Sequence, residues 1–114
     1  MARAKRTIAI VGAGLMGHGI VQVFAQAAHR VRVFDAQPAT LNTLQSRIAK
    51  NLVDLGLETG CERNVSAHAD LGEAVADADI IIEAAPEKLE LKRSIFADLV
   101  RLAPKSALLA SNTS

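Results

Sequence analysis

The chain has 114 residues, of which 50% are hydrophobic and 22% charged, the balance of one ordinary soluble globular domain. A formal net charge of +1 and three Phe without Trp or Tyr argue against a nucleic-acid partner, because a basic field and base-stacking rings are both missing. Cys61 is the single cysteine, so no disulfide framework or metal cluster is expected, and we predict a reducing, cytoplasmic location.

Residues 1–6 include three basic side chains and are expected to form a solvated tail, with a patch for an acidic partner as the alternative. The apolar run at 8–11 is too short for a signal peptide, and no stretch approaches the ~20 apolar residues of a membrane span. We therefore expect no membrane partner and assign residues 7–114 to one domain.

Short apolar runs alternate with longer helical stretches, which predicts an α/β fold with a parallel sheet. The predicted strands are 7–11, 31–34, 64–67, 79–84 and 107–111. The predicted helices are 15–28, 38–55, 71–75 and 88–102; the first is apolar on most sides, so we expect it to be the most deeply buried. Right-handed crossovers with one reversal of direction give a Rossmann-type, doubly wound sheet of order 3-2-1-4-5.

A glycine-rich turn joins the first predicted strand to the first helix, with residues 12–17 reading Gly-Ala-Gly-Leu-Met-Gly. Gly12 permits the tight turn, Gly14 lets the backbone approach a pyrophosphate, and Gly17 lets the helix pack close to the strand. Unpaired N–H groups and the positive end of the helix dipole favour an anion there. The turn therefore predicts a bound dinucleotide.

Asp35 ends the second predicted strand, 18 residues beyond Gly17, where a carboxylate can accept hydrogen bonds from the adenosine ribose. Ala36 and Gln37 follow it, and neither would neutralise a 2′-phosphate. NAD is favoured over NADP, and FAD stays open as an alternative.

Three blocks carry a family resemblance: residues 11–17, Glu-Ala-Ala-Pro-Glu at 83–87 followed by Lys92, and Ser-Asn-Thr-Ser at 111–114. In this order, each at the end of a predicted strand, they resemble the 3-hydroxyacyl-CoA dehydrogenase family over almost everything from Thr7 onward. The resemblance implies hydride transfer between NAD and the 3-hydroxyl carbon of an L-3-hydroxyacyl-CoA, with 3-hydroxybutyryl-CoA as one candidate. It also implies fatty acid β-oxidation, and a homodimer for the full-length form.

The resemblance implies a role for individual residues along the cofactor. Glu87 would lie near the nicotinamide-side ribose with Lys92 within reach, while Asn112 and Ser114 would lie beside the nicotinamide and the substrate hydroxyl. Ser114 would orient that hydroxyl, a catalytic role. The predicted cofactor-binding residues are Gly12, Gly14, Leu15, Met16, Gly17, Asp35, Ala85, Glu87, Lys92, Asn112 and Ser114.

Each of these later residues also has a structural interpretation. Glu87 could stabilise the dipole of the helix it begins, and Lys92 could be a surface lysine. Asn112 and Ser114 could form a turn of small polar residues at a strand end.

Oxidation of the alcohol needs a base, and in the family a His held by a carboxylate serves. His18, His29 and His68 do not match it, and we expect each to be structural or exposed. The family's His–Glu pair and helical domain belong to later segments, so we expect no turnover from residues 1–114 alone.

Two departures from the family and two alternatives remain. Ala28 replaces a usual Gly, so we expect the first helix to end without a left-handed cap. The stretch 55–64 is shorter than in the larger family members, so no coenzyme A contact is assigned.

One alternative is a gulonate- or carnitine-type dehydrogenase, against which Asn112 argues because those relatives tend to carry Ser there. The other is a free-standing NAD-binding or regulatory module.

Overall fold

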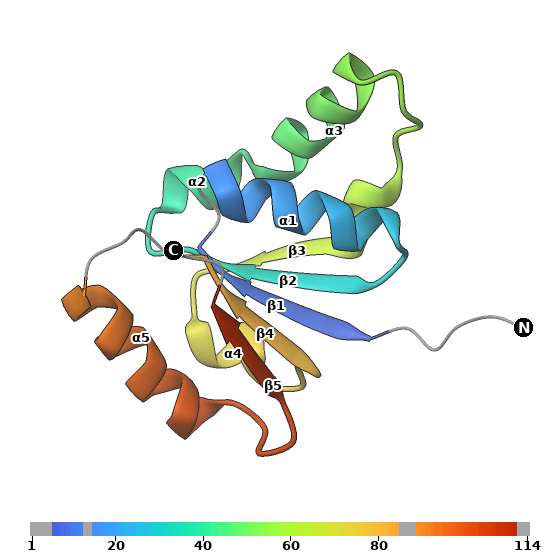
Figure 1. The fold of residues 1–114 in the computed structure, drawn as a ribbon. Helices are drawn as coiled ribbons and strands as arrows, with labels where there is room; N and C mark the ends of the chain where they lie inside the picture. The colour runs from blue at the N-terminus through green and yellow to red at the C-terminus, as the bar shows by residue number, and fades with distance from the viewer. Residues whose placement is uncertain (1–5, 13–14, 85–88, 112–114) are drawn as a thin grey trace, which may run out of the picture.

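The computed structural model describes residues 6–12, 15–84 and 89–111, with the backbone alone described at 15–18 and 89–92. Its parallel sheet has the order β3-β2-β1-β4-β5, which confirms the predicted topology (Figure 1). The strands are β1 (Thr7–Val11), β2 (Arg30–Phe34), β3 (Val65–His68), β4 (Ile80–Glu83) and β5 (Leu108–Ser111). All four strand pairs are parallel.

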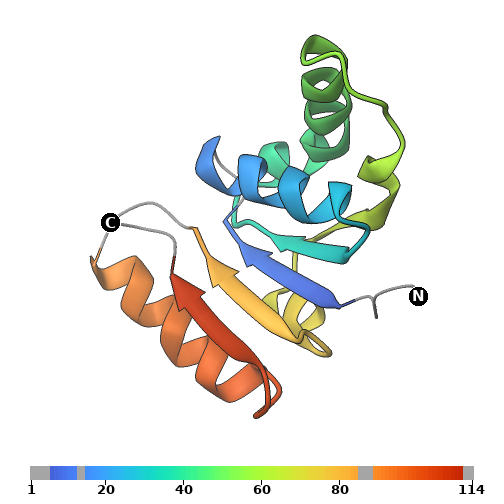
Figure 2. The same cartoon turned by 45° about the vertical axis from the view of Figure 1, so that its right-hand side comes forward.

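Helices cover both faces of this sheet, as the uninterrupted apolar strands predict. The helices α1 (Leu15–Gln26) and α3 (Leu44–Asp54) lie on one face, and α4 (Leu71–Val75) and α5 (Leu89–Leu102) on the other (Figures 1 and 2). Successive β1 side chains therefore enter opposite cores: Ile8 and Ile10 pack with α1 and α3, whereas Ala9 and Val11 pack with α4 and α5. The central strand is thereby buried along its whole length.

The single helix expected over 38–55 is wrong, because two helices meet at Thr43. α2 (Pro38–Asn42) ends there and α3 begins at Leu44, while Thr43 leaves the helical region at φ −104° and ψ 0°. Its hydroxyl donates to the Ala39 carbonyl at 3.1 Å. A threonine side chain that bonds the carbonyl four residues back competes with the helical backbone pattern, which accounts for the interruption.

The end of α1 also differs from expectation. The helix stops at Gln26 instead of Ala28, and Val23 is 63% exposed, so one side of α1 faces solvent. Ala28 does adopt the left-handed conformation that we expected to be absent, with φ 67°. Its N–H donates to the Ala25 carbonyl at 3.0 Å and that of His29 to Phe24 at 3.2 Å, which together form a complete Schellman cap.

Further boundaries are shifted by one residue: β2 begins at 30 instead of 31, β4 spans 80–83 instead of 79–84, and β5 begins at 108 instead of 107. Asn64 belongs to the short 3-10 helix Cys61–Asn64 and its amide donates to the Ala25 carbonyl at 3.2 Å, so β3 begins one residue later than predicted. Arg6, which we assigned to the tail, is held by its backbone: its carbonyl accepts from Arg30 N–H at 3.1 Å and its N–H donates to His29 Nδ1 at 3.2 Å.

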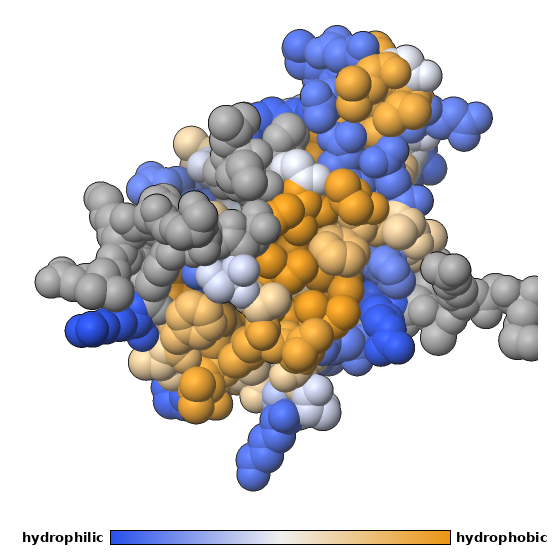
Figure 3. Space-filling view, in the orientation of Figure 1, coloured by the Kyte–Doolittle hydropathy of each residue, from blue (hydrophilic) through white to orange (hydrophobic). Residues whose placement is uncertain are grey.

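Strand β5 forms one edge of the described sheet and is exposed along its length. Its residues Leu108 and Ala110 pair with Ile80 and Ile82 of β4, on the side that α1 faces. Hydrophobic surface gathers over this part of the sheet (Figure 3), and Leu108 is 62% exposed. Within the described ranges, no helix is long and apolar enough to cross a membrane.

Candidate cofactor-binding site

The turn after β1 lies at the middle of the carboxyl edge of the sheet. Gly12 is buried and has φ 106°, a conformation that favours glycine. Its N–H donates to the Phe34 carbonyl at 2.7 Å, and the Val11 carbonyl accepts from Ala84 N–H at 2.8 Å. The end of β1 is therefore held by hydrogen bonds to both neighbouring strands.

Helix α1 begins at Leu15, three residues after Gly12, so its N-terminus lies at this edge. Its first turn contains no acidic residue. The first N–H groups of a helix have no partner within it, and an anion is stabilised there by these donors and by the dipole. The local charge thus suits a pyrophosphate.

Asp35 follows β2 directly and is next in the chain to Phe34, the residue that accepts from Gly12. Its side chain is partly buried, and Oδ1 accepts from the Gln37 N–H at 2.8 Å. This short turn orients the carboxylate, which can accept several hydrogen bonds at once. The acid and the glycine turn therefore end adjacent strands, as ribose and pyrophosphate recognition requires.

Several predicted site residues fall outside this description. Residues Gly14, Ala85, Glu87, Asn112 and Ser114 lie outside the described ranges. Leu15, Met16 and Gly17 belong to α1 and Lys92 to α5, with only their backbone described. Their contacts with a cofactor remain predictions.

Two residues at the same edge, Glu83 and Ser111, belong to the blocks that carry the resemblance, but sequence reasoning assigned them no role. They pair in register at the ends of β4 and β5, and the Ser111 hydroxyl donates to Glu83 Oε1 at 3.1 Å. Glu83 has 0% of its surface exposed. The signal in the sequence was a carboxylate closing a run of three isoleucines, since a buried charge needs a polar partner.

The described histidines have structural contacts. His29 accepts the Arg6 N–H and packs edge-on against Phe24, with ring centroids 6.1 Å apart. His68 Nε2 lies 2.8 Å from the Ser66 hydroxyl at the end of β3. Among the described residues, no group of three or more His, Cys, Asp or Glu could hold a metal ion.

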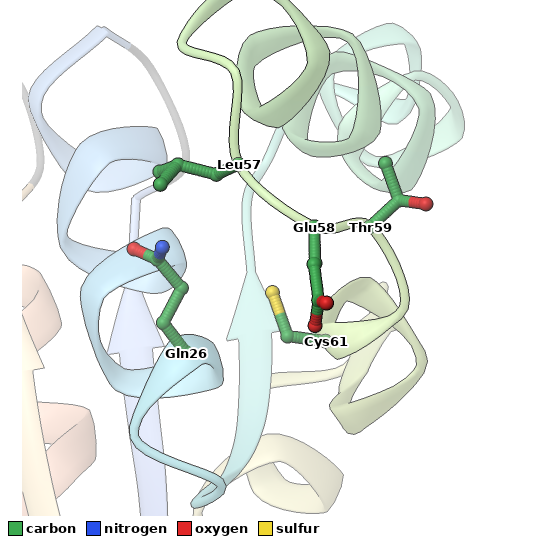
Figure 4. A pocket seen from close by; sticks show the side chains of 5 residues that line it. All are labelled: Gln26, Leu57, Glu58, Thr59 and Cys61. Atoms are coloured by element: carbon green, nitrogen blue, oxygen red, sulfur yellow. The ribbon is translucent and has the colours of Figure 1, made fainter.

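A hollow of about 360 Å³ lies at the opposite end of the molecule, where α1 ends and the loop before β3 begins (Figure 4). It is lined by Gln26, Leu57, Glu58, Thr59 and Cys61. Burial raises the pKa of the Cys61 thiol, and the neighbouring Glu62 charge raises it further. Because α1 runs antiparallel to the strands, this hollow lies at the amino edge of the sheet, away from the glycine turn.

Comparison with known proteins decides the family. Residues 7–114 match the family model of the 3-hydroxyacyl-CoA dehydrogenase NAD-binding domain. The chain belongs to this family. Its fold is a Rossmann fold and its cofactor is NAD.

Individual relatives span a range of substrates. The chain is 37% identical to the 3-hydroxyadipyl-CoA dehydrogenase of Escherichia coli K12, covering 96% of this chain and 24% of the relative. It is 37% identical to the L-carnitine dehydrogenase of Nocardiopsis dassonvillei, covering 97% and 35%. The crystal structure of the Escherichia coli 3-hydroxybutyryl-CoA dehydrogenase superposes with a TM-score of 0.84 at 32% identity, over 98% of this chain and 25% of that one. The chain therefore spans less than half the length of these relatives.

Proposed function

We propose that this chain is the NAD-binding part of an L-3-hydroxyacyl-CoA dehydrogenase. One observation carries the proposal: the Gly12 N–H bond to Phe34 joins the glycine turn to β2, so the start of α1 and Asp35 lie at adjacent strand ends. Helix dipole and carboxylate then act on two separate parts of one dinucleotide. The family match from residue 7 to residue 114 supports the same assignment.

The described residues fit NAD in charge and in hydrogen-bonding chemistry. The acid-free start of α1 would hold the pyrophosphate, and Asp35 would accept from the adenosine ribose hydroxyls. When bound, NAD supplies the acceptor for the hydride that leaves the substrate carbon. This chain contributes binding and orientation, while Ser114 is proposed to hold the substrate hydroxyl.

The cofactor assignment is tested by titrating residues 1–114 with NADH and with NADPH. The chain has no Trp or Tyr, so the emission of the dinucleotide can be followed without protein fluorescence. We expect NADH to bind more tightly than NADPH, since a 2′-phosphate would meet the Asp35 carboxylate. Equal affinities for the two would contradict the assignment.

Asp35→Asn sharpens that test, because an amide oxygen can still accept the Gln37 N–H and so preserve the turn. We expect NADH affinity to fall about tenfold or more, since hydrogen bonds to a charged group contribute about 1.5–3 kcal/mol. Asp54→Asn, which removes the same charge from the exposed end of α3, is the matched control. A wild-type affinity for the Asp35 variant would rule out its ribose role.

A second candidate is a carnitine-type hydroxy-acid dehydrogenase, favoured by the 37% identity to L-carnitine dehydrogenase over 97% of this chain. Asn112 argues for the acyl-CoA substrate instead. We expect no NADH from residues 1–114 with either 3-hydroxybutyryl-CoA or L-carnitine, because none of His18, His29 and His68 matches the family's catalytic His. His29 and His68 are also held in structural contacts. Robust turnover by the purified chain would overturn this view.

We include three further points in the proposal that this chain is part of an L-3-hydroxyacyl-CoA dehydrogenase. They are a cytoplasmic location, a role in β-oxidation and a homodimeric parent enzyme.

A further inference from the structure

The ends of β4 and β5 share a side-chain hydrogen bond that the assigned cofactor contacts do not explain. Ser111 Oγ donates to Glu83 Oε1 at 3.1 Å, across a register pair of the sheet. Glu83 is also the register partner of Val11, the last residue of β1. The carboxylate thus lies between the strand that carries the glycine turn and the strand at the sheet edge.

The burial of Glu83 is costly for the fold. Its side chain is 0% exposed and follows three isoleucines, at a position where an apolar residue would pack without desolvating a charge. Replacing buried ionic or polar groups with apolar residues of similar volume is often neutral or stabilising. Stability alone therefore does not favour a carboxylate here, and costly groups of this kind concentrate at functional sites.

Strand β5 needs such an attachment. All four of its residues are exposed, so packing does little to hold the strand in place. Its backbone pairing with β4 sets the register, and the Ser111 bond adds a side-chain contact at the last residue. In the chain, Glu83 precedes the predicted cofactor residues Ala85 and Glu87, and Ser111 precedes Asn112 and Ser114.

We propose that Glu83 and Ser111 are positioning residues for the cofactor: their hydrogen bond sets the separation of the carboxyl ends of β4 and β5, at the edge of the sheet where the cofactor is proposed to bind. This inference rests on the proposed function. In this proposal the bond makes no direct contact with the cofactor. It acts by holding two strand ends in one geometry, and small displacements of binding groups weaken binding strongly.

The experiment measures NADH affinity and thermal unfolding of residues 1–114 with matched variants. Ser111→Ala removes the donor, and we expect NADH to bind about tenfold more weakly, because a small displacement of binding groups lowers affinity strongly. Ser111→Thr keeps the hydroxyl on a residue that strands accept, and we expect it to restore affinity to within about twofold of wild type. Ser66→Ala, which removes the β3 hydroxyl beside His68, is the control and should leave affinity unchanged.

Variants of Glu83 separate positioning from folding. Glu83→Gln keeps an acceptor oxygen, so we expect it to bind NADH nearly as well as wild type. The double variant Glu83→Met with Ser111→Ala replaces both partners by apolar groups, and we expect weaker NADH binding with an unfolding temperature close to that of wild type. Only a positioning role predicts that binding falls while stability is kept.

The outcomes distinguish this inference from the function on which it rests. If wild type binds no NADH, the proposed function fails and this inference fails with it. If wild type binds NADH and both Ser111→Ala and the double variant bind equally well, the cofactor assignment stands and the positioning role is wrong. A loss of binding that merely follows a loss of folded protein would also overturn it.

Discussion

The rings of Phe24 and His29 pack edge-on, with centroids 6.1 Å apart, across a helix cap whose central residue is an alanine. Between them Ala28 adopts φ 67°, a conformation that costs a residue with a Cβ roughly 1–2 kcal/mol. The cap therefore forms despite its sequence, supported by the ring contact and by the two Schellman hydrogen bonds.

Ala28→Gly should stabilise the protein, because glycine relieves this strain. The gain is reduced by the greater freedom of glycine in the unfolded chain, so we expect about 0.5–1 kcal/mol. Urea denaturation followed by far-ultraviolet circular dichroism measures it. Ala27→Gly, one residue earlier and without a positive φ, is the control and should not stabilise. A destabilised Ala28→Gly would show that the cap carries no strain.

Gly12→Ala should weaken NADH binding far more than an equally strained substitution elsewhere. A Cβ at φ 106° strains the turn that leads into α1, and the turn bond to Phe34 lies at the proposed site. Gly60→Ala is the matched control, since Gly60 has φ 125° and open space around it, in the loop at the other edge of the sheet. We expect Gly60→Ala to lose stability but keep its NADH affinity once corrected for the folded fraction. Equal losses of NADH affinity in Gly12→Ala and Gly60→Ala would contradict a special role of Gly12 at the cofactor site.

The two sides of the β4–β5 pair should differ sharply in their contribution to stability. Ile81 is 0% exposed in the core against α5, and Ile81→Ala should cost about 2–5 kcal/mol through lost burial and a cavity. Leu108 is 62% exposed, so Leu108→Ala should cost less than about 1 kcal/mol. Denaturant midpoints of the two variants test this. A large cost at Leu108 would mean that the exposed face of β5 is covered in solution.

Cys61 should react slowly with iodoacetamide near neutral pH. Burial and Glu62 raise the pKa of its thiol, so the thiolate fraction at a given pH is lower than for an ordinary cysteine and reaction accelerates only at higher pH. Glu62→Gln removes the second cause and should shift the rate profile toward lower pH. The urea-unfolded chain provides the reference rate. A folded chain that reacts as fast as the unfolded one would contradict the raised pKa.

The local sequence pattern was sufficient to predict an element or a motif where a single physical factor dominates. Apolar runs without alternation placed β1 and β4, and crossover handedness then determined the strand order. The glycine turn and Asp35 were also readable, because a helix start and an acid at a strand end follow from short-range spacing.

Boundaries were less predictable, because tertiary contacts compete with local preference there. Thr43 lies within an amphipathic pattern, yet its hydroxyl interrupts the helix. Asn64 looks like the start of a strand, yet its amide bonds the end of α1. In each case side-chain hydrogen bonds contribute to the outcome, and hydrophobic periodicity does not detect them.

From sequence alone, the fold class, the family resemblance and the NAD-binding motif were determined, since each is assembled from short local patterns that can be recognised one by one along the chain. Only the tertiary structure decided that Glu83 and Ser111 meet, because they are 28 positions apart and come together through parallel pairing of β4 with β5. It likewise decided that Ala28 takes a left-handed conformation, which its residue type disfavours and the packing of Phe24 against His29 stabilises.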